Sequence, residues 1–348
     1  MFPITEHVIK SPRHTTFYLA CGPDSGPPII FVHGWPELSL SWRHQLPCFA
    51  ALGFRAIAPD MRGYGRSSVP SRHEDYALEM IVADMLELAD SIGTQKAVWV
   101  GHDWGSPVVW NLAAHHPERC HGVANLCVPY LPGGLSPDQR EPFIDRTVYP
   151  VDKYPAGQWE YQLFYVENFT KAQREFEADI ESTVKVLFRK GNPDGKGKPS
   201  RTAEVRRQGG WFGQLGKAPS LPRDADVITE KDLSAYVAAL TCNGFFGPDS
   251  WYMNHGRNND YAKRAKNGGR ITMPVLFLHG EYDYTCETVT SRLAEPMRAH
   301  CSDLTEVVVK SGHWMAQEKP VDVNAALAAW LARKLPGAWS TQGGVLVA

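Results

Sequence analysis

The sequence predicts an α/β fold with a mostly parallel sheet, into which a helical segment is inserted. Three observations lead to this prediction. Short apolar runs alternate with stretches of helical periodicity, as in parallel sheets with helical crossovers. That alternation stops between about residues 131 and 253. A glycine-flanked turn at residue 103 joins an apolar run to a helix-like stretch. The 348 residues suffice for one such fold with an insertion.

The predicted elements follow from the spacing of apolar residues. Six short runs rich in β-branched and other apolar residues are candidate strands, at 28–32, 54–58, 97–100, 122–127, 274–278 and 305–310. Helical spacing predicts helices over 78–92, which Gly93 would end as a C-cap, and over 322–335.

The middle of the chain has a different pattern. Helical spacing predicts a helix over 171–188 and a second one near 233–240, with glycine-rich and aromatic-rich loops around them. We therefore expect the first part of the α/β core at 1–130, a helical cap at 131–253, and the second part of the core at 254–348.

Composition narrows the classes of partner. A net charge of -2 provides no electrostatic basis for binding nucleic acid or an anionic membrane surface. No apolar run has the length of a membrane crossing, and the N-terminus has no signal-peptide pattern. The seven cysteines are scattered without C-x-x-C spacing, which is typical of reduced thiols. These observations predict a cytoplasmic protein; a homodimer is left open.

The most informative motif is Gly101-His102-Asp103-Trp104-Gly105, which has the form G-x-nucleophile-x-G with Asp103 in the nucleophile position. A serine there suits attack on a carbonyl, because its acyl ester can be hydrolysed. A carboxylate suits attack on a saturated carbon, because the alkyl ester that it forms can also be hydrolysed. The alternative interpretation is an aspartate that caps the following helix.

Two further strand candidates lead to a histidine and an acid. The run 274–278 leads to Asp283, and the run 305–310 leads to His313. The order nucleophile, acid, histidine is that of the hydrolase triad on this kind of sheet. We expect His313 to activate water and Asp283 to orient it. Glu281, two residues before Asp283, is a competing acid that spacing does not exclude.

The loop after the first predicted strand is His33-Gly34-Trp35-Pro36. The backbone N–H groups of Trp35 and Trp104 are candidates for an oxyanion hole during ester hydrolysis. The Trp35–Pro36 bond is a candidate for a cis peptide bond. If the leaving oxygen belongs to an epoxide, an acid is also needed, and the tyrosines of the aromatic segments 159–165 and 245–254 can supply it. Considered alone, such aromatic residues are more often packing residues.

With these motifs together, the chain resembles the soluble epoxide hydrolases of the α/β-hydrolase superfamily. The resemblance extends from about residue 15 to 335. It rests on His33-Gly34-Trp35-Pro36, on Asp60-Met61-Arg62-Gly63-Tyr64-Gly65-Arg66-Ser67, on the turn at Asp103, on Gly312-His313-Trp314, and on two lid segments that contain Tyr161 and Tyr252.

The resemblance implies an α/β-hydrolase fold: a mostly parallel eight-stranded sheet flanked by helices, with an inserted α-helical cap. It implies that Tyr161 and Tyr252 polarise the epoxide oxygen while Asp103 opens the ring. Substrate contacts are expected from Trp104, Pro36 and the two tyrosines. The substrate would be a small apolar epoxide that is converted to a vicinal diol, without metal or cofactor.

Two other functions compete with this one. Haloalkane dehalogenases share the nucleophile and base but commonly carry Asn where this chain has Trp35. A hydrolase-fold receptor would bind its ligand without turnover, which the fold permits. A metal at His115, His116, Cys120 and His121 is disfavoured, because these residues follow the helix after the turn, away from the triad.

Overall fold

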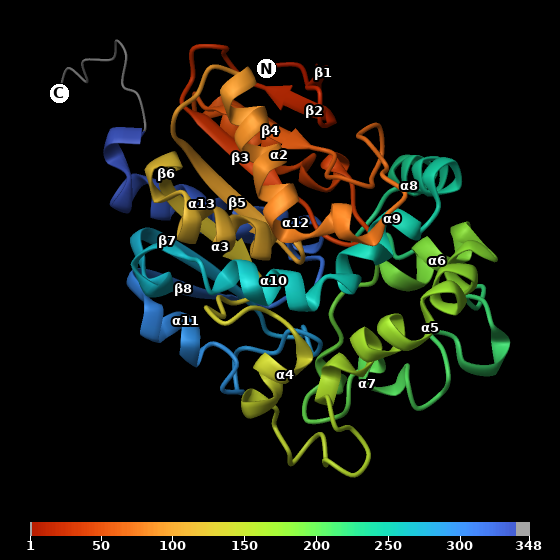
Figure 1. Ribbon diagram of the computed structural model, residues 1–348. Coiled ribbons are helices and arrows are strands. Elements are labelled where there is room, and N and C mark those ends of the chain that lie inside the picture. The colour runs from red at the N-terminus through yellow and green to blue at the C-terminus, as the bar shows by residue number, and fades with distance from the viewer. Residues whose placement is uncertain (1, 339–348) are drawn as a thin grey trace.

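The computed structural model describes residues 2–338 of the protein (Figure 1). Within these residues, eight strands form one sheet in the order β1-β2-β4-β3-β5-β6-β7-β8. The strands are β1 (Thr5–Lys10), β2 (Thr15–Cys21), β3 (Pro28–Val32), β4 (Arg55–Pro59), β5 (Ala97–His102), β6 (Cys120–Leu126), β7 (Ile271–Gly280) and β8 (Cys301–Val309). β1 pairs with β2 and β2 with β4 in antiparallel fashion, whereas all other pairs are parallel. The carboxyl ends of six strands therefore meet at one edge.

Helices cover both faces of this sheet (Figure 1). α2 (Leu78–Ser91) and α3 (Gly105–His115) pack on one face, while α1 (Gln45–Ala51) and α13 (Pro320–Lys334) pack on the other. Successive residues of β3 point to opposite faces, so Ile30 and Val32 lie in the first core and Phe31 in the second. None of the helices in the described residues has the length and apolar character needed to cross a membrane.

The segment of the chain that leads from β6 to β7 forms a set of helices, which lie beyond the carboxyl edge of the sheet (Figure 1). It comprises α4 (Pro137–Arg140), α5 (Glu160–Glu177), α6 (Ile180–Leu187), α7 (Arg201–Glu204), α8 (Glu230–Asn243) and α9 (Phe246–Ser250). The next helix, α10 (His255–Ala262), packs instead on α2 of the core, where the Asn258 side chain accepts a hydrogen bond from the Leu78 N–H at 2.8 Å. The remaining helices, α11 (Glu295–His300) and α12 (Met315–Glu318), precede and follow β8.

The sequence predicted the parallel part of the sheet but not its antiparallel edge. All six candidate runs are strands, β3 to β8, and the helices predicted over 78–92 and 322–335 are α2 and α13. β1 and β2 were missed. β1 lies at the open edge with four exposed residues of six, so it has no apolar run to reveal it.

One predicted helix was wrong in its bounds. The periodic stretch 171–188 is not one helix, because α5 ends at Glu177 and α6 begins at Ile180. Asp179 separates them and accepts a hydrogen bond from the Ser182 N–H at 3.0 Å, which makes it an N-cap. The apolar spacing continues across the break because both helices pack on the same core. The helix predicted at 233–240 is confirmed within α8.

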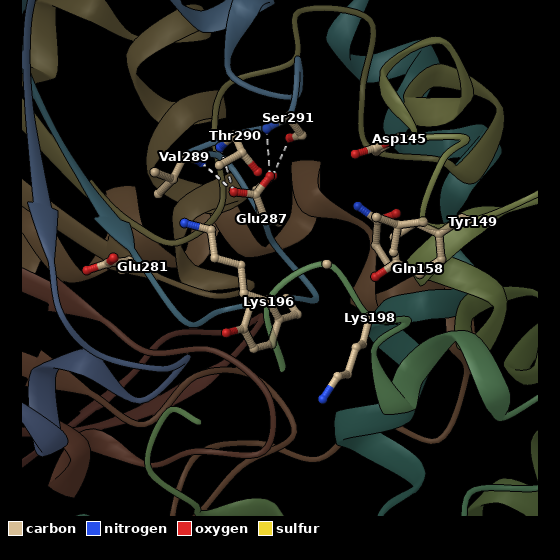
Figure 2. Close-up of a pocket in the computed structure, with 13 residues that line it drawn as sticks. Asp145, Tyr149, Gln158, Lys196, Lys198, Glu281, Glu287, Val289, Thr290 and Ser291 are labelled. Atoms are coloured by element: carbon tan, nitrogen blue, oxygen red, sulfur yellow. Dashed lines mark hydrogen bonds between the residues drawn. The ribbon is translucent and has the colours of Figure 1, made fainter. Parts of the chain in front are cut away.

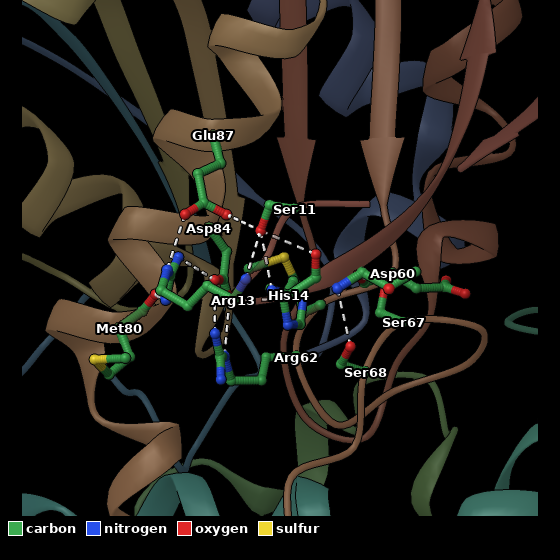
Figure 3. A network of polar contacts seen from close by, with 12 residues as sticks. Ser11, Arg13, His14, Asp60, Arg62, Ser67, Ser68, Met80, Asp84 and Glu87 are labelled. Carbon is green, nitrogen blue, oxygen red and sulfur yellow. Dashed lines mark hydrogen bonds and ion pairs between the residues drawn. The ribbon is translucent and has the colours of Figure 1, made fainter. Parts of the chain in front are cut away.

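A buried polar network joins the antiparallel edge to α2 (Figure 3). Arg62, which follows β4, donates hydrogen bonds from Nε and Nη2 to the two oxygens of Asp84, both at 2.7 Å. Arg13, just before β2, reaches the same carboxylate at 2.6 Å and Glu87 at 2.8 Å. Each charge that is buried here has an opposite charge beside it, as a buried ion pair requires.

Candidate active site

Asp103 occupies the turn between β5 and α3, at the carboxyl edge of the sheet. Its φ is 49°, a left-handed conformation that is rare for a residue other than glycine. The flanking glycines are required by close backbone approach. A Cβ on Gly105 would lie 2.0 Å from the Val32 carbonyl oxygen, and one on Gly101 would lie 2.5 Å from the Gly105 carbonyl oxygen. The turn therefore presents the Asp103 carboxylate above the sheet.

Both oxygens of the Asp103 carboxylate face polar partners. The Trp35 N–H donates a hydrogen bond to Oδ1 at 2.7 Å. The second oxygen, Oδ2, lies 3.3 Å from Nε2 of His313. The loop after β3 approaches so closely that a Cβ on Gly34 would lie 2.4 Å from Oδ1 and 2.6 Å from the Trp104 nitrogen. The N–H groups of Trp35 and Trp104, which were predicted as an oxyanion hole, thus belong to two segments that contact each other next to Asp103. The Trp35–Pro36 bond is cis.

His313 connects Asp103 to a second carboxylate. Its Nδ1 donates a hydrogen bond to Oδ2 of Asp283 at 2.7 Å, and the other Asp283 oxygen accepts the Cys286 N–H at 3.1 Å. Burial alone would lower the pKa of His313, but the carboxylates of Asp283 and Asp103 raise it well above its ordinary value. Burial would raise the pKa of Asp283, but His313 lowers it. The two carboxylates therefore favour the protonated form of the imidazole that lies between them.

Glu281, the competing acid, lies elsewhere. It lines an outer hollow of about 170 Å³ together with Lys196, Tyr284 and Glu287 (Figure 2). The Glu287 carboxylate in that hollow accepts backbone N–H groups of residues 289–291 at 2.7 to 2.8 Å. Between the two acids, only Asp283 is hydrogen-bonded to His313.

A second buried acid–histidine pair, Glu37 and His102, contacts the backbone of His313 and was not predicted. His102 donates from Nδ1 to Glu37 at 2.7 Å and from Nε2 to the His313 carbonyl oxygen at 2.7 Å. Burial opposes both charges, yet Glu37 raises the pKa of His102 to about 10, and His102 lowers the pKa of Glu37 to about 2. Both residues adjoin the predicted motifs, since Glu37 follows Pro36 and His102 precedes Asp103. That adjacency was the available signal.

Asp103 borders two hollows. The larger, of about 170 Å³, has aromatic walls, and its lining residues are Trp35, Asp103, Tyr161, Leu187, Thr202, Trp211, Tyr252, Thr285, His313 and Trp314. The smaller, of about 30 Å³, is more polar and is lined by Asp103, Trp104, Pro107, Val128, Leu135, Arg140, Tyr161, Gln162 and Cys286. Asp103 and Tyr161 are common to both, so they stand where the two hollows meet.

Tyr161 and Tyr252 are brought together on the cap side of the larger hollow. Tyr161 belongs to α5, Tyr252 follows α9, and their ring centroids are 5.5 Å apart at 76°. Gln162 donates a hydrogen bond to the Tyr161 hydroxyl at 2.9 Å. Burial raises the pKa of both phenols far above the ordinary value, so both carry their protons at neutral pH.

The other two residues expected to contact substrate, Trp104 and Pro36, differ in their positions. Trp104 lines the smaller hollow, and its ring lies 5.2 Å from that of Tyr252. Pro36 is buried and is not among the residues that line either hollow, and its expected substrate contact stays a prediction. The Trp35 ring forms the wall instead, stacked 5.7 Å from Trp211. Asp249, also unpredicted, holds this indole by accepting its Nε1–H at 2.9 Å, and burial raises the pKa of Asp249 well above its ordinary value.

Metal ligation has little room here. Among the described residues, two triplets bring ligand atoms within 4.8 Å, His102–Cys127–His313 and Asp283–Cys286–His313. Both use His313, whose nitrogens already face Asp283 and Asp103. The histidines and cysteine at 115–121 form no such triplet in the described part of the chain, and His115 stacks on Tyr261 at 3.8 Å.

Comparison with known proteins agrees with this geometry. The α/β-hydrolase fold family model matches residues 27–175. Epoxide hydrolase A of Mycobacterium tuberculosis is 33% identical over 332 residues, which cover 94% of this chain and 97% of that protein. The chain belongs to the epoxide hydrolase family.

Other relatives extend the comparison. The solved structure of epoxide hydrolase A from Mycobacterium thermoresistibile superposes with a TM-score of 0.78 and 32% identity, covering 95% of this chain and 99% of that one. Bifunctional epoxide hydrolase 2 of Sus scrofa is 35% identical over 313 residues, 88% of this chain. The chain spans about half the length of that mammalian relative, because the match covers 52% of it.

Proposed function

We propose that this member of the family hydrolyses epoxides to vicinal diols through an ester formed on Asp103. The observation that carries the proposal is a carboxylate at the strained turn, in contact with His313 and facing two protonated tyrosines. A hydroxyl there would form an ether with a saturated carbon, and water does not readily cleave ethers. The carboxylate forms an ester, which water can cleave.

The first step opens the ring. An oxygen of Asp103 attacks one epoxide carbon, the bond from that carbon to the ring oxygen breaks, and the ester forms. The ring oxygen leaves as an alkoxide, which takes a proton from Tyr161 or Tyr252. Because burial keeps both phenols protonated, they act as acids at neutral pH.

The second step hydrolyses the ester. Esterification removes the negative charge of Asp103 beside His313, and so removes one of the causes that raise the pKa of that imidazole. The proton that His313 loses replaces the one given by the tyrosine. Neutral His313, oriented by Asp283, then takes a proton from water, which attacks the Asp103 carbonyl carbon. The N–H groups of Trp35 and Trp104 stabilise the oxyanion, and its collapse breaks the bond from the carbonyl carbon to the ester oxygen. The alkoxide that leaves takes the proton of the new Asp103 carboxyl group, so the diol is released and the Asp103 carboxylate and protonated His313 are restored.

The cap side determines what reaches Asp103. We infer that residues 131–253 form the cap and that 1–130 and 254–338 form the core, because α9 packs on α5 whereas α10 packs on α2. Asp249 of α9 also holds the Trp35 indole, which lines the larger hollow. Residues 339–348 of the expected second core part lie outside the described residues. The aromatic walls of the larger hollow favour an apolar group on the epoxide.

The test compares an epoxide with a haloalkane, because the runner-up function shares the nucleophile and the base. Purified protein is incubated with styrene oxide and, separately, with 1-chlorobutane. The proposal predicts phenylethanediol from the first and no chloride from the second, with activity unchanged by a metal chelator. Chloride release without any diol formation would contradict the proposal in favour of dehalogenation.

A further inference from the structure

Two arginines are buried in the described part of the chain, and they differ in their partners. Arg62 is 3% exposed and forms a bidentate ion pair with Asp84 (Figure 3). Arg140, at the end of α4, is 6% exposed, and among residues 2–338 no carboxylate lies within ion-pair distance of its guanidinium. A buried charge is costly unless an opposite charge accompanies it. Arg140 therefore lacks a partner that Arg62 has.

The contacts of Arg140 leave most of its donors unused. Its guanidinium lies 4.6 Å over the Trp159 ring and donates from Nη2 to the Gln162 side-chain oxygen. Nε is buried and has no hydrogen-bond partner among residues 2–338. Burial lowers the pKa of Arg140 to about 10, which leaves the group charged at neutral pH. A neutral donor would suffice for the bond to Gln162, so that bond does not account for a buried cation.

Arg140 lies close to the proposed nucleophile. It lines the smaller hollow together with Asp103 and Tyr161, and Gln162 connects it to the Tyr161 hydroxyl. An anionic group on a substrate held at Asp103 would therefore enter the hollow that Arg140 faces. The volume of about 30 Å³ exceeds the ~10–15 Å³ that one water needs, so this hollow has room for a small polar group such as a carboxylate.

We propose that the substrate is an epoxy acid whose carboxylate is attached directly to the epoxide ring and binds Arg140. This inference rests on the proposed function. The carboxylate supplies the missing counter-ion, and the planar guanidinium fork matches its two oxygens. The larger, aromatic hollow receives an aryl or alkyl group on the other ring carbon. Arg140 also offsets the repulsion between the substrate's charge and the Asp103 nucleophile.

The kinetic test compares 3-phenylglycidate with its neutral amide. Charge-assisted hydrogen bonds predict that wild-type kcat/KM is about 10- to 100-fold higher for the acid. Arg140→Met should lower the ratio of the two values to about one or below, because the repulsion from Asp103 is then no longer offset, and Arg140→Lys should retain part of the preference. The ratio is the readout, because a general loss of activity lowers both values. Arg257→Met, which removes an exposed arginine on α10, should keep the wild-type ratio.

A second measurement needs no variant at Arg140. Calorimetry measures the binding of 3-phenylpropanoate and of 3-phenylpropanamide to the wild-type protein. We expect the dissociation constant of the acid to be lower than that of the amide by about 10-fold or more. Diol from styrene oxide but from neither 3-phenylglycidate nor its amide would overturn the epoxy-acid inference and leave the proposed function intact. Diol from none of the three epoxides would contradict the proposed function, and calorimetry would still decide the role of Arg140. Diol from both epoxides at equal kcat/KM, together with equal binding of acid and amide, would overturn the epoxy-acid inference and leave the proposed function intact.

Discussion

The two sides of the active-site cavity are built differently. On the core side, Asp103, His313 and Asp283 follow the ends of parallel strands and hold one another by hydrogen bonds and charge. On the cap side, Tyr161 and Tyr252 come from helical segments and meet through ring packing. Groups that form and break covalent bonds are thus fixed by the sheet. The groups that we propose to receive the leaving oxygen and the substituents come from the segment between β6 and β7 of the chain, where they can differ without disturbing the core.

The largest effect should come from the core side. Asp103→Ala removes the attacking oxygen, so we expect kcat for diol formation to fall by about 10⁵-fold or more, as for loss of a covalent nucleophile. Steady-state assays with styrene oxide measure it. A loss of less than about tenfold would mean that the strand-end carboxylate is not the nucleophile, and the division between the two sides would fail.

His313→Gln should separate the two chemical steps. Ring opening needs no base, whereas ester hydrolysis does, so we expect kcat to fall by about 10³-fold while an adduct of substrate mass accumulates on the protein. Intact mass spectrometry after mixing with styrene oxide detects it. Unmodified protein, together with the loss of activity, would mean that His313 is required before the ester forms.

Substitutions on the cap side should lower activity less, because two tyrosines can each donate the proton. Tyr161→Phe and Tyr252→Phe should each lower kcat/KM by about 10- to 100-fold, because either phenol can still donate to the ring oxygen, and the double variant should lose more than either one. Tyr261→Phe, a matched change on α10 away from the cavity, should leave kcat/KM unchanged. If the double variant is as active as the wild-type protein, the cap side only packs around the substrate.

Loss of the buried Glu37–His102 pair should affect the stability of the protein more than its turnover. Glu37→Gln breaks a buried ion pair and should lower the free energy of unfolding by about 3 kcal/mol. The lowered pKa of Glu37, about 2 against an ordinary 4.5, makes the contribution present above pH 4.5 and lost as pH falls toward 2. The raised pKa of His102, about 10 against 6.5, makes it present below pH 6.5 and lost as pH rises through 10.

Denaturant unfolding tests this pH dependence. The stability difference between wild type and Glu37→Gln should be greatest between pH 4.5 and 6.5 and should shrink toward pH 10. Glu281→Gln is the matched control, since Glu281 lies on the outer hollow, and it should show no such profile. A difference that does not vary with pH would indicate that Glu37 contributes by packing and not by charge.

The contrast between the two sides also explains what sequence could predict. Asp103, Asp283 and His313 each follow a short apolar run, and the carboxyl ends of parallel strands converge, so their proximity was predictable. Tyr161 and Tyr252 were identified only through family resemblance, because helix spacing does not show which aromatic residue faces a cavity. Arg140 was missed. In the sequence it is one charge in a polar stretch, and its burial depends on long-range packing against Trp159.

The central claim is that the Asp103 carboxylate bonds covalently to substrate carbon. The most direct test is a single turnover of styrene oxide with excess protein in oxygen-18 water, followed by mass analysis of the diol and of the peptide that contains Asp103. The account predicts a first diol without label and one oxygen-18 atom in the Asp103 carboxylate. Label in the first diol, with an unlabelled Asp103 peptide, would contradict it.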